Sequence, residues 1–239
     1  MANNGSLPPK IVFFDMEGTI FRKVVKSTNG NTAPSAWTLI AAHLGKDALA
    51  EEEATKVKWN GGGYSGYVDW MEDTIRIHQK YGLTKDFYDK VMSGVEYHPG
   101  VKETFEILRG KGIRTGLVSG GFKSQADRAV RDLKINHAFA ACEYFWDGDG
   151  KLVHWNLLPA DFEGKVDFMM LIMKEHGISP RDAAFVGDGK NDVHFAKAVG
   201  TSVAFNAAKE LQDVSTFSVN QPEGREDFRA ILPLLGIDV

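Results

Sequence analysis

An apolar run near the start of the chain ends in residues that could do chemistry. Residues 11–14 read Ile-Val-Phe-Phe, and Asp15 and Glu17 come directly after them, followed by a glycine and a threonine. Four consecutive apolar residues are typical of a strand that is buried on both faces of a parallel sheet. A carboxylate at the end of such a strand is costly to bury unless it binds something. Because ligands of open α/β sheets lie beyond the carboxyl ends of the strands, Asp15 is a candidate for catalysis or metal binding.

Two further apolar segments end in polar residues, and a lysine precedes one of them. Ser119 and Gly120 follow one segment, Asp188 and Asp192 follow the other, and Lys165 begins the helical pattern before the latter. Each feature alone has an ordinary explanation as a helix cap, a turn or a solvated charge. Because parallel strands of one sheet end at the same edge, we expect these residues to meet the first carboxylate there.

This collection of residues suits phosphoryl transfer. A carboxylate that attacks a phosphate dianion faces charge repulsion, and a hard divalent cation held by Asp15 and Asp188 would offset it. The same cation would bridge to a phosphate oxygen.

The remaining groups have roles in holding the phosphate and moving protons. The Ser119 hydroxyl, the Gly120 amide and Lys165 would hold the equatorial phosphate oxygens as charge redistributes. Glu17 would protonate the leaving alcohol and then deprotonate the hydrolytic water.

The elements that must position these residues form an α/β pattern. Apolar strands alternate with helical periodicity, which predicts βαβ units and a doubly wound parallel sheet with a Rossmann-like core. The expected core strands are residues 11–14, 113–118, 183–186 and 201–205. The helical patterns that flank them cover residues 101–108, 122–133, 166–176 and 193–199.

The stretch between the first and second core strands is too long for one crossover. It contains helical patterns near residues 36–43 and 67–80, so we expect an inserted small helical cap that sets substrate specificity. Further along, the sequence Asp-Gly-Asp-Gly at 147–150 predicts a hairpin turn within residues 142–158. The expected division is a disordered tail at 1–9, a catalytic core at 10–21 and 97–239, and the cap at 22–96.

Composition excludes several classes of partner. The chain has 239 residues, with 28 Lys and Arg against 32 Asp and Glu, for a net charge of −4. A general binder of nucleic acid or of an anionic membrane would show a basic excess, whereas a small anionic substrate held by a few local cations is not excluded. Together with the residues suited to phosphoryl transfer, this makes a small phosphorylated metabolite the expected partner. Cys142 is the single cysteine, which excludes an internal disulfide and favours a soluble, cytoplasmic protein. No window approaches the roughly 18 apolar residues of a membrane span. The oligomeric state is not predicted.

Four segments together resemble the ordered motifs of the haloacid dehalogenase superfamily, and most closely its phosphoserine-phosphatase-like branch. The resemblance covers about residues 10–235 and rests on Asp-Met-Glu-Gly-Thr at 15–19, Val-Ser-Gly-Gly-Phe at 118–122, Gly-Lys at 164–165 and Gly-Asp-Gly-Lys-Asn-Asp at 187–192.

The resemblance implies specific roles at these positions. Asp15 would be the nucleophile that forms a phospho-aspartate intermediate. Mg²⁺ would be bound by Asp15, the backbone carbonyl of Glu17 and Asp188. Asp192 would belong to the same metal site and orient metal-bound water or Lys165, and Asn191 would face the substrate.

Two departures from the family pattern concern the proton-transfer acid and the substrate. The second acid of the first motif is usually Asp, and here it is Glu17. Phosphoserine phosphatases recognise serine through a Glu shortly after this motif and an arginine in the cap. Here no acid occurs at 21–26, and Glu-Asp-Thr at 72–74 stands where the arginine is expected.

The same region suggests a different substrate feature. Arg22, Lys23 or Lys26 could favour a substrate with an additional anionic group, whereas the simpler interpretation is that these cations are solvated linker residues.

Three other functions are considered. A phosphotransferase of the same fold would pass the phosphoryl group to an alcohol, and a regulatory protein would bind phosphate without hydrolysis. A dinucleotide-binding domain is excluded because no Gly-x-Gly-x-x-Gly follows the first strand.

Overall fold

A seven-stranded sheet forms the centre of the molecule. The computed structural model describes residues 7–23, 35–222 and 224–238. The strand order is β4-β3-β2-β1-β5-β6-β7, and all neighbours are parallel except β4, which runs antiparallel to β3. This arrangement confirms the predicted doubly wound α/β fold. The strands are β1 (Ile11–Phe14), β2 (Arg114–Phe122), β3 (His137–Trp146), β4 (Leu152–Leu157), β5 (Ala183–Gly187), β6 (Thr201–Phe205) and β7 (Phe217–Val219).

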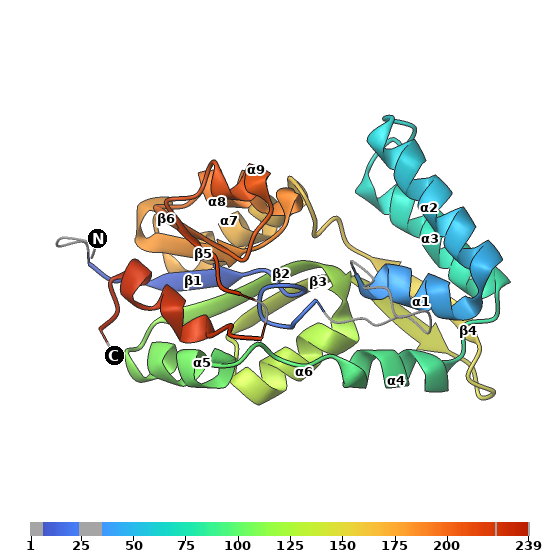
Figure 1. The fold of residues 1–239 in the computed structure, drawn as a ribbon, viewed down its shortest axis with the longest axis horizontal. Coiled ribbons are helices and arrows are strands. Elements are labelled where there is room, and N and C mark those ends of the chain that lie inside the picture. The colour runs from blue at the N-terminus through green and yellow to red at the C-terminus, as the bar shows by residue number, and fades with distance from the viewer. Residues whose placement is uncertain (1–6, 24–34, 223, 239) are drawn as a thin grey trace.

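Helices cover both faces of the sheet (Figure 1). The α-helices are α1 (Ala36–Leu44), α2 (Lys46–Asn60), α3 (Tyr67–Lys80), α4 (Lys85–Gly94), α5 (Val101–Gly110), α6 (Lys123–Leu133), α7 (Gly164–His176), α8 (Val193–Lys197) and α9 (Lys209–Gln212). Short 3₁₀ helices cover Pro180–Asp182, Lys190–Asp192, Phe228–Ile231 and Pro233–Leu235. None of the helices in the described part of the chain is long and apolar enough to cross a membrane.

The alternation of side chains along β1 explains the two faces. Val12 and Phe14 pack into one core with α5, α6 and the 3₁₀ helix at 228–231. Ile11 and Phe13 point to the opposite face and pack with α7, α8 and α9. All four side chains are fully buried, as the unbroken apolar run predicts for a central parallel strand.

Helices α1–α4, which we call the helical segment, lie beyond one end of the parallel sheet, toward the β3–β4 hairpin (Figure 1). They do not enclose a core of their own, because their apolar side chains pack with residues of β2, β3 and β4. Members of this shared core include Trp37, Ile40, Met71, Ile75, Tyr88, Met92, Phe122, Cys142, Tyr144 and Leu152.

The expected elements are found close to where the sequence places them. The strand at 201–205 and the helix at 67–80 have the predicted bounds. The hairpin turn also forms, and the Asp147 carboxylate accepts hydrogen bonds from the backbone N–H groups of Asp149 and Lys151. The main difference is β2, which continues through residues 119–122 rather than ending at 118. Its pairing with β3 shifts register between Ser119 and Phe122, so the ladder is irregular at the two glycines.

Candidate active site

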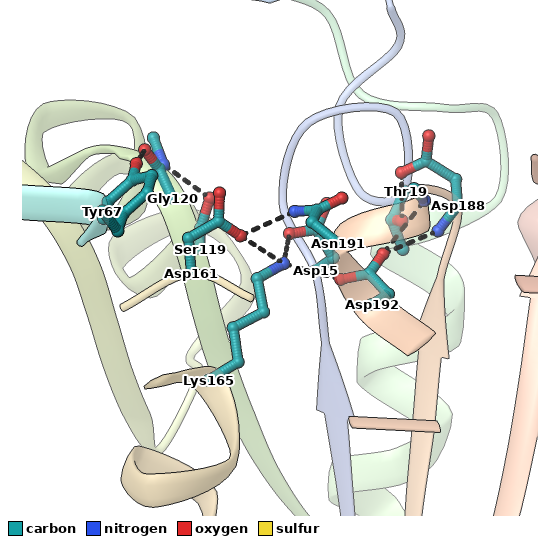
Figure 2. Close-up of polar contacts among 12 residues, drawn as sticks. Asp15, Thr19, Tyr67, Ser119, Gly120, Asp161, Lys165, Asp188, Asn191 and Asp192 are labelled. Carbon is teal, nitrogen blue, oxygen red and sulfur yellow. Dashed lines mark hydrogen bonds and ion pairs between the residues drawn. The ribbon is translucent and has the colours of Figure 1, made fainter. Parts of the chain in front are cut away.

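The carboxyl ends of β1, β2 and β5 bring the predicted residues together at one edge of the sheet. Phe14 at the end of β1 pairs in register with Leu117 of β2 and Val186 of β5. The residue after Phe14 is Asp15, and its backbone N–H donates to the Val186 carbonyl at 3.0 Å. The convergence follows from parallel strands sharing one direction. Figure 2 shows these side chains around Lys165.

Lys165 is the central cation of this edge. It lies at the start of α7 and is fully buried, and its Nζ donates to Asp15 Oδ1 and Asp192 Oδ1, both at 2.6 Å. Burial alone favours the neutral amine, but the neighbouring Asp15 and Asp192 carboxylates outweigh it and hold the pKa of Lys165 well above its usual range. The side chain is therefore an ammonium ion aimed at the end of β1.

Asp192 is an orienting carboxylate. Its Oδ2 accepts hydrogen bonds from the backbone N–H groups of Asp188 at 3.1 Å and Gly189 at 3.0 Å. With Oδ1 bonded to Lys165, both carboxylate oxygens have partners within the protein. Asp192 thus fixes both the lysine and the loop that carries Asp188.

A divalent cation fits between the acidic residues. Carboxylate oxygens of Asp15, Asp188 and Asp192 lie within 4.8 Å of one another, and all three residues are buried. Burial raises the pKa of Asp15 well above its usual range. The charge of Lys165 opposes this shift, and repulsion from the other two carboxylates adds to it. A bound cation would reverse this penalty by stabilising the ionised forms. The set of hard oxygen donors is the kind that Mg²⁺ takes.

Asp188 has two further contacts. The Thr19 hydroxyl donates to its Oδ1 at 3.0 Å, and Lys23 forms an ion pair with its Oδ2. Burial raises the pKa of Asp188, and the charge of Lys23 opposes the shift. Thr19 closes the first motif, and the sequence analysis gave it no role.

Glu17 lies beside these acids and reaches toward the helical segment. Its Oε2 accepts a hydrogen bond from the backbone N–H of Ala36, the first residue of α1, at 3.2 Å. Its Oε1 is buried without a hydrogen-bond partner among the described residues and lies close to Gly121. Burial raises the pKa of Glu17 to about 7, while the bond from Ala36 opposes the shift. A carboxyl group with this pKa can both give and take a proton near neutral pH.

The end of β2 supplies a hydroxyl and a stretch of backbone. Ser119 Oγ accepts a hydrogen bond from the Gly121 N–H at 3.1 Å, which leaves its own proton free for another acceptor. The Gly120 carbonyl accepts bonds from Tyr67 Oη at 2.7 Å and Trp37 Nε1 at 3.2 Å. Figure 2 shows Tyr67 and Ser119 on either side of Gly120.

Asp161 is a site residue that the sequence analysis missed. Its Oδ1 accepts a hydrogen bond from Asn191 Nδ2 at 2.7 Å and lies 3.6 Å from Lys165 Nζ. Its Oδ2 is so close to Gly120 that a Cβ atom there would collide with it. The one available signal was an acid four residues before Lys165, at helical spacing. Asn191, predicted to face the substrate, is therefore held by Asp161.

A cavity of about 240 Å³ lies between this edge and the helical segment. Asp15, Glu17 and Ser119 line it from the sheet, and the Glu52–Lys56 ion pair, at 2.9 Å, lines it from α2. Aromatic residues of the helical segment differ in their relation to this cavity. Tyr67 and Trp70 line it, whereas Trp59 stacks on the ring of Trp70 and Tyr64 bonds to Asp73.

The cations that follow the first motif have carboxylate partners within the chain. Arg22 pairs with Glu226 at 3.1 Å, and Lys23 pairs with Asp188. Lys23 lines the cavity, but its partner is a candidate metal ligand. These contacts give no support to the hypothesis that either residue binds an additional anionic group, and Lys26 lies outside the described residues.

Comparison with known proteins identifies the family. The model of the haloacid dehalogenase-like hydrolases matches residues 9–200. The chain belongs to this family. A phosphoserine phosphatase of Lactococcus lactis is 31% identical over 160 residues, which cover 66% of this chain and 73% of the relative. The predicted membership of the phosphoserine-phosphatase-like branch of haloacid dehalogenase hydrolases is therefore confirmed.

A longer relative and a solved structure extend the comparison. A phosphoserine phosphatase of Archaeoglobus fulgidus is 26% identical over 219 residues, which are 89% of this chain but 57% of the relative's length. A structure described as a phospho-aspartyl intermediate analogue of phosphoserine phosphatase superposes with a TM-score of 0.72. It covers 97% of this chain and 100% of that one at 23% identity, which shows that the fold is shared.

Proposed function

We propose that this haloacid dehalogenase-like hydrolase cleaves the phosphate monoester of a small metabolite, with Asp15 as nucleophile and Mg²⁺ as cofactor. The observation that carries the proposal is the 2.6 Å contact between buried Lys165 Nζ and Asp15 Oδ1. It aims one oxygen of Asp15 at a fixed cation, while Oδ2 accepts no hydrogen bond from the described residues. That second oxygen is available to attack phosphorus and form a phospho-aspartate.

The residues around Asp15 would bind and orient the phosphate. The hydroxyl of Ser119, the N–H of Gly120 and the ammonium of Lys165 would hold its oxygens. Mg²⁺, bound by Asp15, the backbone carbonyl of Glu17 and Asp188, would offset the repulsion between nucleophile and phosphate. Asp192 would keep Lys165 and the Asp188 loop in place.

Glu17 would move the protons of both half-reactions. In its protonated form it would give a proton to the leaving alcohol as the bond between phosphorus and that oxygen breaks. As a carboxylate it would then take a proton from the water that attacks the phospho-aspartate, which releases phosphate and restores Asp15. Its Oε1, which has no hydrogen-bond partner in the described part of the chain and lies beside Gly121, supports this role.

The helical segment would act as the cap that contacts the leaving group, with a boundary near the predicted residues 22–96. The residues of the helical segment that line the cavity give little support to recognition of a serine leaving group. Thr74 lines the cavity where the family's arginine is expected, and Arg76 pairs with Glu72 at 2.7 Å instead. The leaving group would instead meet the Glu52–Lys56 pair, Trp70 and neighbouring cap residues.

A panel of phosphate esters tests the proposal directly. Wild type and Asp15→Asn are assayed with Mg²⁺ on sugar phosphates, phosphoserine and 4-nitrophenyl phosphate. The amide keeps the shape of Asp15 but cannot form a stable phospho-intermediate, so hydrolysis should fall by about a thousandfold or more. Asp149→Asn, at the exposed hairpin turn, is the matched control and should keep full activity.

Trapping of the intermediate provides a second measurement. Acid quenching during turnover should yield one phosphoryl group on wild type and none on Asp15→Asn. Orthophosphate binding in the presence of Mg²⁺ without turnover of any ester would favour the regulatory alternative. Faster capture of the phosphoryl group by an added alcohol than by water would favour a phosphotransferase.

A further inference from the structure

Two side chains of the helical segment hold a backbone group in the predicted phosphate site. The Gly120 carbonyl lies where the β2–β3 ladder shifts register, so its partners come from elsewhere. They are Tyr67 Oη at 2.7 Å, from the start of α3, and Trp37 Nε1 at 3.2 Å, from α1. Two donors from separate helices therefore converge on one carbonyl oxygen of the sheet edge.

The peptide unit that follows this carbonyl is held at both ends. A peptide group is planar, so fixing the Gly120 carbonyl also fixes the direction of the Gly121 N–H. That N–H donates to Ser119 Oγ at 3.1 Å. Because the serine oxygen accepts this bond, its own proton is left to point toward the phosphate. The helical segment thus acts on the Ser119 hydroxyl through one rigid peptide.

The local sequence makes outside support necessary. Two consecutive glycines have the widest conformational freedom of any dipeptide, and no side chain of their own restricts them. A Cβ on Gly120 would collide with the Asp161 carboxylate, and one on Gly121 would lie 2.9 Å from Met16 Cε, the far end of a flexible side chain. Crowding therefore opposes a side chain at Gly120, and the peptide between the two glycines depends on neighbours for its orientation.

We propose that Tyr67 and Trp37 are positioning residues that orient the Gly120–Gly121 peptide, so that the phosphate site is complete only when the cap is in contact with it. This inference rests on the proposed phosphatase function. Neither side chain takes part in bond making. Burial raises the pKa of Tyr67 well above its usual range, so the phenol remains a donor at neutral pH.

The test removes one hydroxyl and keeps the ring. Tyr67→Phe deletes the donor to Gly120, and Tyr64→Phe deletes a hydroxyl of the same segment that bonds to Asp73 outside the cavity. Because the affected group would hold phosphate, kcat/KM should fall by about five- to twentyfold for every ester in the panel, whatever the leaving group. Inhibition by orthophosphate should weaken by a similar factor. Tyr64→Phe should stay within about twofold of wild type.

A second measurement reports directly on the Gly120–Gly121 peptide and does not depend on catalytic turnover. Hydrogen exchange of the Gly121 amide, followed by NMR, should be about tenfold faster in Tyr67→Phe than in wild type and unchanged in Tyr64→Phe. A Gly121 exchange rate equal to that of wild type would overturn the proposal, as would losses that depend on the leaving group. If Gly121 exchange is faster in Tyr67→Phe but the wild type hydrolyses no ester, the positioning role of Tyr67 would stand and the proposed phosphatase function would fail.

Discussion

Glu17 shows what one additional methylene does at the residue scale. The family usually has Asp at this position, and the longer side chain here spans from the sheet edge to the first N–H of α1. One carboxylate oxygen is bonded to the helical segment, and the other lies beside Gly121 with no hydrogen-bond partner among residues 7–23, 35–222 and 224–238. The departure that the sequence raised as a doubt therefore has a structural accommodation, because α1 supplies a partner at the distance that Glu requires.

Replacing Glu17 by Gln tests its role in proton transfer. The amide keeps the bond from Ala36 but cannot donate a carboxylic proton to an alcohol. Alkyl phosphates, whose leaving groups need that proton, should lose about a hundredfold or more in kcat/KM. 4-Nitrophenyl phosphate has a leaving group that departs as an anion, so its loss in the phosphorylation step should be much smaller. Equal losses for both kinds of ester would contradict the assignment of Glu17 as the acid.

His78 provides a separate prediction about stability and pH. It is fully buried, its Nδ1 lies 2.9 Å from the Tyr144 hydroxyl, and burial lowers its pKa to about 3. Below an ordinary histidine pKa of about 6.5, the imidazole of His78 is protonated in the unfolded chain but stays neutral in the folded protein. Stability is therefore lost as pH falls, by about 2 kcal/mol between about pH 7 and 5 from this residue.

Denaturant unfolding at several pH values measures this contribution. The free energy of unfolding of His78→Gln should fall less steeply between pH 7 and 5 than that of wild type. His154→Gln, at an exposed position on β4, should retain the wild-type slope. Identical slopes for wild type and His78→Gln would show that the buried imidazole is not the source.

At the scale of elements, α2 shows why part of the helical segment could not be predicted from the sequence. Its segment, Lys46–Asn60, is predominantly polar, and only Ala48, Glu52 and Thr55 are buried. A helix that presents polar side chains to a cavity lacks the apolar stripe on which periodicity depends. Helix α3 has such a stripe, with Met71 and Ile75 in the shared core, and the sequence predicts its bounds.

The Glu52–Lys56 pair of α2 leads to a prediction about leaving-group choice. Glu52→Gln removes the buried charge that lines the cavity, whereas Glu53→Gln removes the exposed partner of the same lysine. Glu52→Gln should change the ratio of kcat/KM between esters by about fivefold or more, with inhibition by orthophosphate unchanged. Glu53→Gln should leave both quantities as in wild type. A uniform loss in Glu52→Gln would place this residue with the phosphate rather than with the leaving group.

Much of the candidate active site was predictable because of the direction of the strands. Asp15 and Asp188 directly follow their strands and Ser119 lies near the end of its strand, so strand direction fixes where these side chains lie and the sequence positions imply spatial proximity. The positions of Asp161 and Tyr67 are not fixed by the direction of a strand. Asp161 lies in a connection before α7, and the hydroxyl of Tyr67 acquires its partner only when α3 packs beside the end of β2. Tertiary contacts of this kind are not indicated by the local sequence pattern.

At the scale of the whole molecule, the shared core links the helical segment to the sheet. Phe122, Cys142 and Leu152 belong to β2, β3 and β4, and they pack with α1, α3 and α4. The helices therefore have no separate set of apolar contacts on which to fold. We expect cap and sheet to unfold together in one transition.

Leu152→Ala tests this cooperativity. Removing a side chain that is 4% exposed should cost about 2–4 kcal/mol of unfolding free energy. All 5 tryptophans occur between residues 37 and 155, so fluorescence reports mainly on the helical segment and hairpin. Circular dichroism reports on helices throughout the chain. The two transitions should coincide in both proteins, and an earlier fluorescence change in Leu152→Ala would reveal a cap that melts separately.

The location of Cys142 has a practical consequence for spectroscopy. The chain's single sulfhydryl is wholly enclosed in the shared core, and burial raises its pKa well above the usual range. It should therefore resist alkylating dyes while the protein is native. A second cysteine at Val57, whose side chain is 73% exposed on α2, could then be tagged selectively without deleting the natural one. A fluorophore placed there would report, in an otherwise unaltered molecule, whether the outer helices change position when a phosphate ester binds.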